Sequence, residues 1–171
     1  MTRSWPVRAS CIGIEKKTSH RSKPADSGDV AELPDQGSLM GNSNEMTIIF
    51  DSRPENEGLA RVAAAAFCTQ LNPTLEEVAD LKTAVSEAVT NCIIHGYQGE
   101  VHKIRMKCVR KERTIYLDIE DDGIGIADVE KAMEPLYTTR ADQDRSGMGF
   151  TFMEAFMDEV KVTSQVGKGT C

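Results

Sequence analysis

The sequence predicts an α/β two-layer sandwich, a mixed, mostly antiparallel sheet with helices on one face. Residues 103–108 and 115–120 alternate apolar and polar side chains, which is the period of a strand with one buried face. Residues 75–93 repeat apolar side chains at helical spacing, so one side of that helix must be buried against another layer. Together the two periods indicate a sheet covered by helices.

The first 45 residues differ in composition from the rest. They are rich in Ser, Gly, Pro and mixed charge and show no sustained strand or helix period. We therefore expect 1–45 to be a disordered or non-native extension, and 46–171 to be the folded domain. The extension holds six basic and six acidic side chains, so the net charge of −7 belongs to the domain. That acidity argues against nucleic acid as a partner and favours a protein.

Hydropathy points to a cytoplasmic protein. No apolar run approaches the roughly 18 residues of a membrane span, so we expect no membrane association. The N-terminus is polar and lacks the apolar core of a secretory signal.

The domain is predicted to begin with a strand and two helices. Residues 47–50 form the strand, and Asp51 or Ser52 caps a helix that has Pro54 in its first turn. That helix should stop before Pro73. The spacing of Thr74 and Glu77 is that of a capping box, which opens the second helix.

The remaining elements follow in order. The two alternating strands should be joined by a hairpin turn at 111–113, and a short helix at 128–133 should precede a polar loop. A glycine-led helix is expected at 149–158 and a strand at 160–164. The turn at 167–170 should lead into a further strand. We expect that C-terminal strand to be missing, which would clip the domain and leave a sheet edge unpaired.

Glu87 and Asn91 are four residues apart, so they project from the same side of the second helix. The amide oxygen of Asn91 is a hard ligand suited to Mg²⁺. Glu87 could orient or deprotonate a hydroxyl that attacks a phosphate. The pair alone is more typical of a solvated helix face, although its apolar neighbours argue against that interpretation.

Two glycine turns suggest a nucleotide. Asp121 follows a strand, and Gly123 and Gly125 let the backbone approach a ligand; a carboxylate accepts from an exocyclic amine and so favours adenine. Gly147 and Gly149 open a helix whose N-terminal amides attract anions. An ordinary Asp-Gly turn would explain the first motif alone, and a lone Gly-x-Gly is a weak signal.

Taken in order, these motifs resemble the GHKL superfamily, which has the Bergerat ATP-binding fold. The resemblance covers residues 46–170 and is closest to the sporulation anti-sigma F factors. The segments that carry it are 57–62, 86–91 with 95–97, 135–139, 145–151 and 157–160.

The resemblance implies a homodimer that binds ATP or ADP with Mg²⁺. It also implies a serine kinase that holds sigma F inactive and phosphorylates a serine of an anti-anti-sigma protein. Asn91 would be the metal ligand, Glu87 the catalytic base and Arg145 a catalytic arginine near the γ-phosphate. Arg61 would bind protein partners. Residues implied to contact the nucleotide are Asn91, Asp121, Gly123, Gly125, Thr138, Thr139, Ser146, Gly147, Met148, Gly149 and Thr170.

Three alternatives stay open at this stage. A general-stress anti-sigma kinase would use the same chemistry on a different sigma factor. A sensor histidine kinase would need an upstream phosphoacceptor helix, and His20 lies in a segment without a pattern. A non-catalytic module could bind a sigma factor in a nucleotide-dependent way without phosphotransfer.

Overall fold

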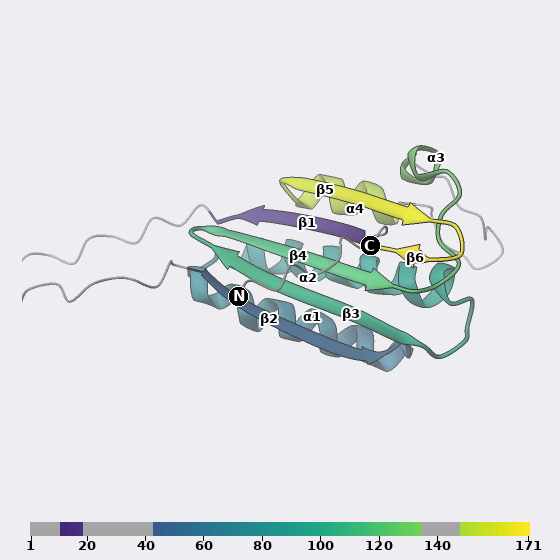
Figure 1. Ribbon diagram of the computed structural model, residues 1–171. Coiled ribbons are helices and arrows are strands. Elements are labelled where there is room, and N and C mark those ends of the chain that lie inside the picture. The colour runs from purple at the N-terminus through teal and green to yellow at the C-terminus, as the bar shows by residue number, and fades with distance from the viewer. Residues whose placement is uncertain (1–10, 19–42, 135–147) are drawn as a thin grey trace, which may run out of the picture.

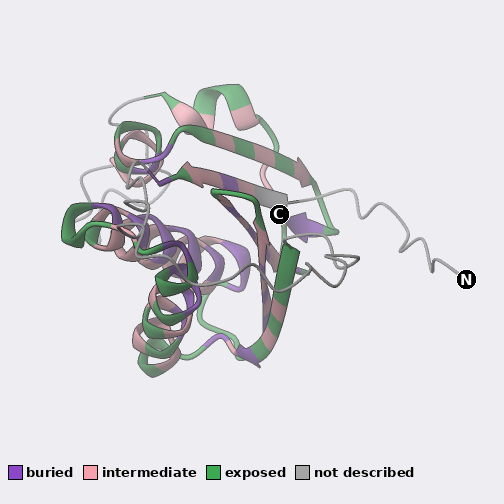
Figure 2. Cartoon of the chain, turned by 90° about the vertical axis from the view of Figure 1, so that its left-hand side faces the viewer, coloured by how far each residue is buried: buried purple, intermediate pink, exposed green. Residues whose placement is uncertain are grey.

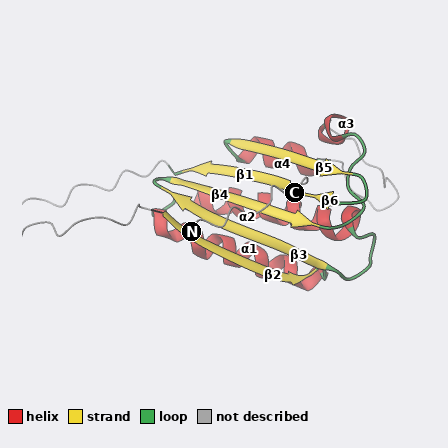
Figure 3. Ribbon diagram, in the orientation of Figure 1, coloured by secondary structure: helices red, strands yellow, loops and turns green. Residues whose placement is uncertain are grey.

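A computed structural model describes residues 11–18, 43–134 and 148–171. The described residues form a six-stranded sheet covered on one face by helices (Figure 1 and Figure 3). This confirms the predicted two-layer α/β sandwich. The strands are β1 (Cys11–Lys17), β2 (Ser43–Asp51), β3 (Lys103–Lys111), β4 (Thr114–Asp121), β5 (Glu159–Gln165) and β6 (Gly169–Thr170). The helices are α1 (Pro54–Cys68), η1 (Thr69–Leu71), α2 (Leu75–Asn91), η2 (Cys92–Gly96), α3 (Val129–Met133) and α4 (Gly149–Phe156).

The strand order in the sheet is β1-β5-β6-β4-β3-β2, with an additional pairing of β1 with β4. Every pairing among the described strands is antiparallel. The alternating pattern of β3 and β4 places one face of each strand against the helices. The side chains buried there are Ile104, Met106, Cys108, Ile115, Leu117 and Ile119.

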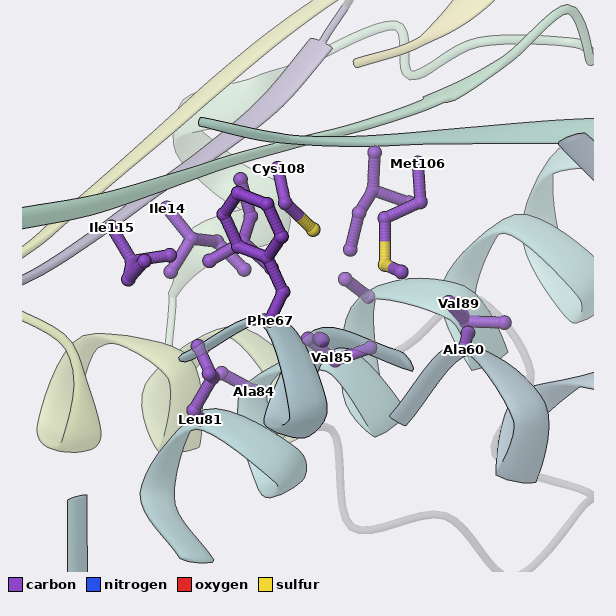
Figure 4. Packing of buried hydrophobic residues seen from close by; sticks show 14 of the residues in the cluster. Ile14, Ala60, Phe67, Leu81, Ala84, Val85, Val89, Met106, Cys108 and Ile115 are labelled. Atoms are coloured by element: carbon purple, nitrogen blue, oxygen red, sulfur yellow. The ribbon is translucent and has the colours of Figure 1, made fainter. Parts of the chain in front are cut away.

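The core lies between the two layers, where buried residues of helices and sheet face each other (Figure 2). Leu81, Val85 and Val89 of α2 recur at helical spacing and are fully buried. They pack with Phe67 of α1 beneath the sheet (Figure 4). Burying a side chain of this size stabilises the fold by about 1.5–3 kcal/mol, so α2 is held mainly by its apolar face.

The capping predictions had mixed outcomes. Thr74 caps α2 as expected: its hydroxyl accepts from the Glu77 N–H at 3.1 Å, and the Glu77 carboxylate accepts from the Thr74 N–H at 2.7 Å. The prediction that Asp51 or Ser52 caps α1 was wrong, because Arg53 is the N-cap. Ser52 is buried instead, and its hydroxyl donates to the carbonyl of residue 100 and accepts from the N–H of residue 102.

The expectation that residues 1–45 stay outside the fold was wrong for part of that segment. Residues 11–17 form β1, which pairs with both β4 and β5, and β2 begins at Ser43. Residues 1–10 and 19–42 lie outside the described residues. The strand gives a weak sequence signal, because the apolar alternation of Ile12 and Ile14 is short and is followed by charged residues. Long-range pairing supplies the stability that local sequence does not indicate.

The expected unpaired edge after Thr170 was also wrong. Gly169–Thr170 form β6, which pairs with β4 and β5. Beyond it, β1 occupies the place between those two strands (Figure 1). Within the described ranges, no helix combines the length and apolar character that a bilayer crossing requires.

Candidate functional site

The candidate site is organised by the C-terminal half of α2 and the short helix that continues it. Glu87 and Asn91 are near the end of α2, where both are partly exposed. The chain then runs on as the π-helix η2, in which the N–H of Tyr97 donates to the carbonyl of Cys92 at 3.1 Å. Such π segments are often found at functional sites. Here the wider turn carries the backbone from Asn91 to a position next to Asp121.

Asp121 ends β4 and is 4% exposed. Its Oδ1 accepts from the N–H of Gly123 at 2.9 Å and from the N–H of Thr170 at 3.2 Å. The Cys92 thiol donates a further hydrogen bond to the carboxylate. Burial raises the pKa of Asp121, and the hydrogen bonds from Gly123, Cys92 and Thr170 oppose that rise. The carboxylate is therefore fixed in orientation by groups that approach it from three segments of the chain.

Glycines allow these segments to approach one another. A Cβ on Gly96 would lie 2.8 Å from Asp121 Oδ1, and a Cβ on Gly123 would lie 2.2 Å from the carbonyl oxygen of Gly96. Gly125 has a φ of +74°, and a Cβ there would lie 2.3 Å from the carbonyl oxygen of Gln165. A side chain at these positions would push the turn after β4 away from η2 or β5.

Thr170 is 5% exposed and lies opposite Asp121 in the β4–β6 pairing. Its hydroxyl is 3.0 Å from the hydroxyl of Ser164, which donates to the Gly169 carbonyl at 2.9 Å. The same Ser164 oxygen accepts from the N–H of Ile126 at 2.7 Å. Ser164 thus joins β5 and β6 to the turn that follows Asp121, and Thr170, which was predicted to contact the nucleotide, lies beside Asp121.

At the other end of the site, Glu87 and Asn91 face the start of α4. A Cβ on Gly149 would lie 2.9 Å from Glu87 Oε2, 3.6 Å from Asn91 Nδ2 and 3.7 Å from Asn91 Oδ1. Met148 is the N-cap of α4 and provides no side-chain cap. The structure therefore brings together Glu87, Asn91 and Gly149, which are predicted site residues from two helices.

A divalent cation would find oxygen donors at this end. The amide oxygen of Asn91 and the carboxylate of Glu87 are hard donors, and Mg²⁺ typically takes one or two protein ligands and fills its shell with water and phosphates. The described residues contain no group of three or more His, Cys, Asp or Glu side chains that could enclose a metal by themselves. The donor set fits a cation that arrives with a phosphate ligand.

Several predicted residues are not part of this geometry. Arg61 lies on α1, where its Nε is 3.5 Å from Glu57 Oε1, and its neighbours Leu59 and Val62 are exposed apolar side chains. It belongs to a surface on α1. The predictions for Thr138, Thr139, Arg145, Ser146 and Gly147 concern residues outside the described ranges.

Sequence reasoning missed two residues that support Asp121. Cys92 is a buried free thiol that follows the apolar spacing of the second helix, and nothing in the sequence indicated that it also contacts the carboxylate. The hydroxyl of Tyr97 accepts from the N–H of Asp122 at 2.8 Å and donates to the Lys103 carbonyl. The signal available in the sequence was a tyrosine directly after the glycine that ends a helix. The sequence could not indicate its hydrogen-bond partners, because β3 and β4 come next to Tyr97 only in the folded structure.

Comparison with known proteins agrees with this geometry. Residues 50–171 match the sequence model of a protein family described as the histidine kinase-like ATPase domain. The fold, the Asp121 turn and the paired polar residues of α2 define the chain as a GHKL-type ATPase domain, a class whose name implies nucleotide binding.

Curated relatives narrow the family further. An anti-sigma F factor of Thermoanaerobacter sp. is 53% identical over 131 residues, which cover 77% of this chain and 92% of the relative. Those of Clostridium acetobutylicum and Clostridium novyi are 54% and 56% identical, with 74% and 75% of this chain and 89% and 91% of the relatives covered. The chain belongs to the anti-sigma F factor family.

Proposed function

We propose that this chain is an anti-sigma factor and an ATP-dependent protein serine kinase. It holds sigma F inactive in the cytoplasm and transfers the γ-phosphoryl group of ATP to a serine of an anti-anti-sigma partner, as a homodimer. Residues 46–171 make up the kinase domain, completed by β1 from the N-terminal segment. The names of the relatives support the sigma F target over a general-stress one.

One observation carries the proposal. Asp121 lies against Gly96, the last residue of η2, and the pair Glu87–Asn91 lies a few residues earlier on the same continuous helical segment, α2 followed by η2. At Asp121 the site offers a buried acceptor to a base, and at Glu87–Asn91 it offers oxygen donors beside the N-terminus of α4. A nucleotide placed along this segment would have its base at Asp121 and its phosphates at Gly149, where helix amides attract anions.

At the base end, Asp121 selects adenine. Oδ1 is already used by the N–H groups of Gly123 and Thr170, so Oδ2 is the oxygen left to accept from an exocyclic amine. A carboxylate cannot donate, so it favours the amine of adenine over the carbonyl that guanine has at the same place. The three hydrogen bonds to the carboxylate keep it oriented before a ligand arrives.

At the phosphate end, Glu87 acts as the general base. It accepts the proton of the substrate serine as the serine oxygen forms a bond to the γ-phosphorus, the bond from that phosphorus to the β,γ-bridging oxygen breaks, and ADP leaves. Asn91 would hold Mg²⁺ through its amide oxygen, and the cation would neutralise phosphate charge. Of the residues outside the described ranges, we propose Arg145 as a second source of positive charge and the lid residues Thr138, Thr139, Ser146 and Gly147 as phosphate contacts.

The decisive experiment is Glu87→Gln, assayed with the purified anti-anti-sigma partner and sigma F. Gln keeps the shape of Glu but cannot take a proton, so we expect serine phosphorylation to fall by about 100-fold or more. Binding of ADP and of sigma F should stay within about threefold of the parent. Glu76→Gln is the matched control, because Glu76 is exposed in the first turn of the same helix.

The outcomes separate the candidate functions. Phosphotransfer at the parent rate in Glu87→Gln would remove Glu87 from the mechanism. A parent chain that binds ADP and sigma F but phosphorylates nothing would be a non-catalytic sigma-binding module. Light scattering of the parent chain measures its mass and tests the homodimer directly.

A further inference from the structure

Strands β6 and β1 lie end to end at the same strand position in the sheet, although they are near opposite ends of the sequence. Both are antiparallel to β4 on one side and to β5 on the other. Figure 1 shows the end of β6 meeting the start of β1 between those strands. Together the two segments therefore occupy the position of a single strand between β4 and β5.

The two registers agree on how the segments join. Against β4, Thr170 is opposite Asp121 and Ile12 is opposite Ile119. Against β5, Thr170 is opposite Ser164 and Ile12 is opposite Val162. In both ladders Ile12 stands two places after Thr170, so residue 171 fills the place between them.

The backbone hydrogen bonds of Cys171 agree with this register. Cys171 exchanges two backbone hydrogen bonds with Thr163, both at 3.0 Å, and the register of β1 also puts Cys11 opposite Thr163. Residues 171 and 11 thus converge on one position. The continuous strand that the sheet would accept reads 169–171 followed directly by residue 12.

Specific contacts fix β1 in this place. Ile14 is 2% exposed and lies in the core near Ile115 and Phe67 (Figure 4). Lys16 Nζ reaches through the layer to Asp80 Oδ2 at 3.3 Å and donates to the Phe156 carbonyl at the end of α4. These contacts require one register, because a shift by one residue would turn Ile14 and Lys16 to the open face.

Two more hydrogen bonds attach β1 to the segment that precedes β5. The N–H of Lys17 donates to Asp158 Oδ2 at 2.7 Å, and the N–H of Asp158 donates to the carbonyl of Glu15 at 3.0 Å. Among the described strands, β5 has no direct pairing with β4, so it joins the sheet only through β1 and the two residues of β6. Ser164 and Thr170, which support Asp121, depend on that attachment.

We propose that β6 and β1 are the two halves of one split strand, and that β1 binding between β4 and β5 is a condition for nucleotide binding at Asp121. The N-terminal strand is then a positioning element of the site, which acts through β5 and Thr170. The coupling to nucleotide rests on the binding role proposed above, whereas the split strand itself rests on the registers and contacts alone.

A circular permutation tests the split strand. In the first variant, residues 43–171 continue directly into residues 12–42; in the control, residues 43–171 continue into 13–42, which shifts β1 by one residue. We expect the first variant to unfold within about 3 °C of the parent and to bind ADP within about threefold. The control should unfold at least about 10 °C lower and bind ADP at least about tenfold more weakly, because Ile14 leaves the core.

Equal melting temperatures of the two permutants, or a first variant as unstable as the control, would overturn the split strand. The melting comparison needs no nucleotide, so it stands even if the parent chain binds no ADP and the proposed function fails. The two failures are thereby distinguished.

A pair of full-length variants tests the coupling. Ile14→Ala in β1 and Leu71→Ala in η1 both remove a buried aliphatic side chain, so both should lower the melting temperature. Only Ile14→Ala should weaken ADP binding, by about fivefold, measured by calorimetry at a temperature where both variants are folded. The same ADP affinity in both variants would show that β1 stabilises the fold without positioning the site.

Discussion

The two ends of the proposed nucleotide site differ in what surrounds their glycines, which is backbone at one end and a side chain at the other. At the Asp121 end, a Cβ on Gly123 or Gly169 would meet backbone oxygens at 2.2 and 1.9 Å. At the other end, the nearest atom to a Cβ on Gly149 is the tip of the Glu87 side chain, at 2.9 Å. Backbone cannot move aside, whereas a side chain can change rotamer. The base end is therefore fixed, and the phosphate end can adjust as bonds form and break.

The largest effect should come from the fixed end. Gly169 has a φ of +96°, and a Cβ there would lie 1.9 Å from the Asp121 carbonyl oxygen. We expect Gly169→Ala to lower the free energy of unfolding by about 3 kcal/mol or more, measured by urea denaturation. Gly58→Ala is the control: nothing lies within 4 Å of its Cβ, and in α1 alanine should stabilise by about 0.5–1 kcal/mol. Similar stabilities of the two variants would contradict a rigid base end.

A second variant separates binding from stability at the same end. Asp121→Asn replaces the acceptor facing the adenine amine with an amide, so ADP affinity should fall by about 100-fold. The amide oxygen can still accept from Gly123 and Thr170, so the fold should hold. Calorimetric titration of ADP, with melting temperature alongside, measures both effects. Retained ADP affinity would remove Asp121 from base recognition.

The difference in stability between Asp121→Asn and the parent should depend on pH. Burial raises the pKa of Asp121 in the folded state above its unfolded value of about 3.9, so ionisation costs the folded protein stability. This cost in stability is absent at pH values below the unfolded-state pKa of Asp121, and it is complete at pH values above the folded-state pKa. Asn pays no such cost, so the stability of Asp121→Asn relative to the parent should rise between about pH 4 and pH 7. Urea unfolding at both pH values tests the sign.

The adjustable end should respond in the opposite way. In Gly149→Ala, the new methyl group displaces the Glu87 carboxylate without straining backbone. We expect phosphotransfer to fall by about tenfold while the free energy of unfolding changes by less than about 1 kcal/mol. The assay is serine phosphorylation of the anti-anti-sigma partner. A loss of stability as large as that of Gly169→Ala would erase the contrast between the two ends.

The smallest effect concerns the thiol beneath Asp121. Cys92→Ala removes one hydrogen bond to the carboxylate, so ADP affinity should fall by about threefold. Cys108→Ala is the matched control, because Cys108 is an equally buried thiol, with a pKa raised to about 12 by burial, that makes no contact with Asp121. Equal affinities would show that the backbone N–H donors alone orient Asp121.

Periodicity explains what the sequence could predict. The helices α1 and α2 and the strands β3 and β4 have local patterns strong enough to locate them, and Thr74 with Glu77 marked a helix start. Glu87 and Asn91 were predictable as a pair because helical spacing alone puts them on one side. The structure places both side chains opposite Gly149, so helical geometry alone located this pair in the fold, and their roles stay predictions.

The rest depends on contacts between distant segments. β1 was missed because its partners are β4 and β5, and nothing near it in sequence indicates them. Ser52 looked like a helix cap because serine favours that position, but its hydroxyl is used by the loop before β3. Cys92 is a buried core thiol, as its helical spacing indicates, but its contact with Asp121 could not be predicted. In each case tertiary structure supplies the hydrogen-bond partner.

The joining of β1 to the far end of the chain has a consequence for synthesis on the ribosome. Lys16 and the Phe156 carbonyl that it contacts are 140 residues apart in sequence. Such pairings close the longest loops of a fold and so tend to form late. The N-terminal strand, which is made before the other strands, must wait for β5, its partner at Glu159–Gln165. During synthesis, the sheet beside Asp121 can therefore close only after β5 has left the ribosome.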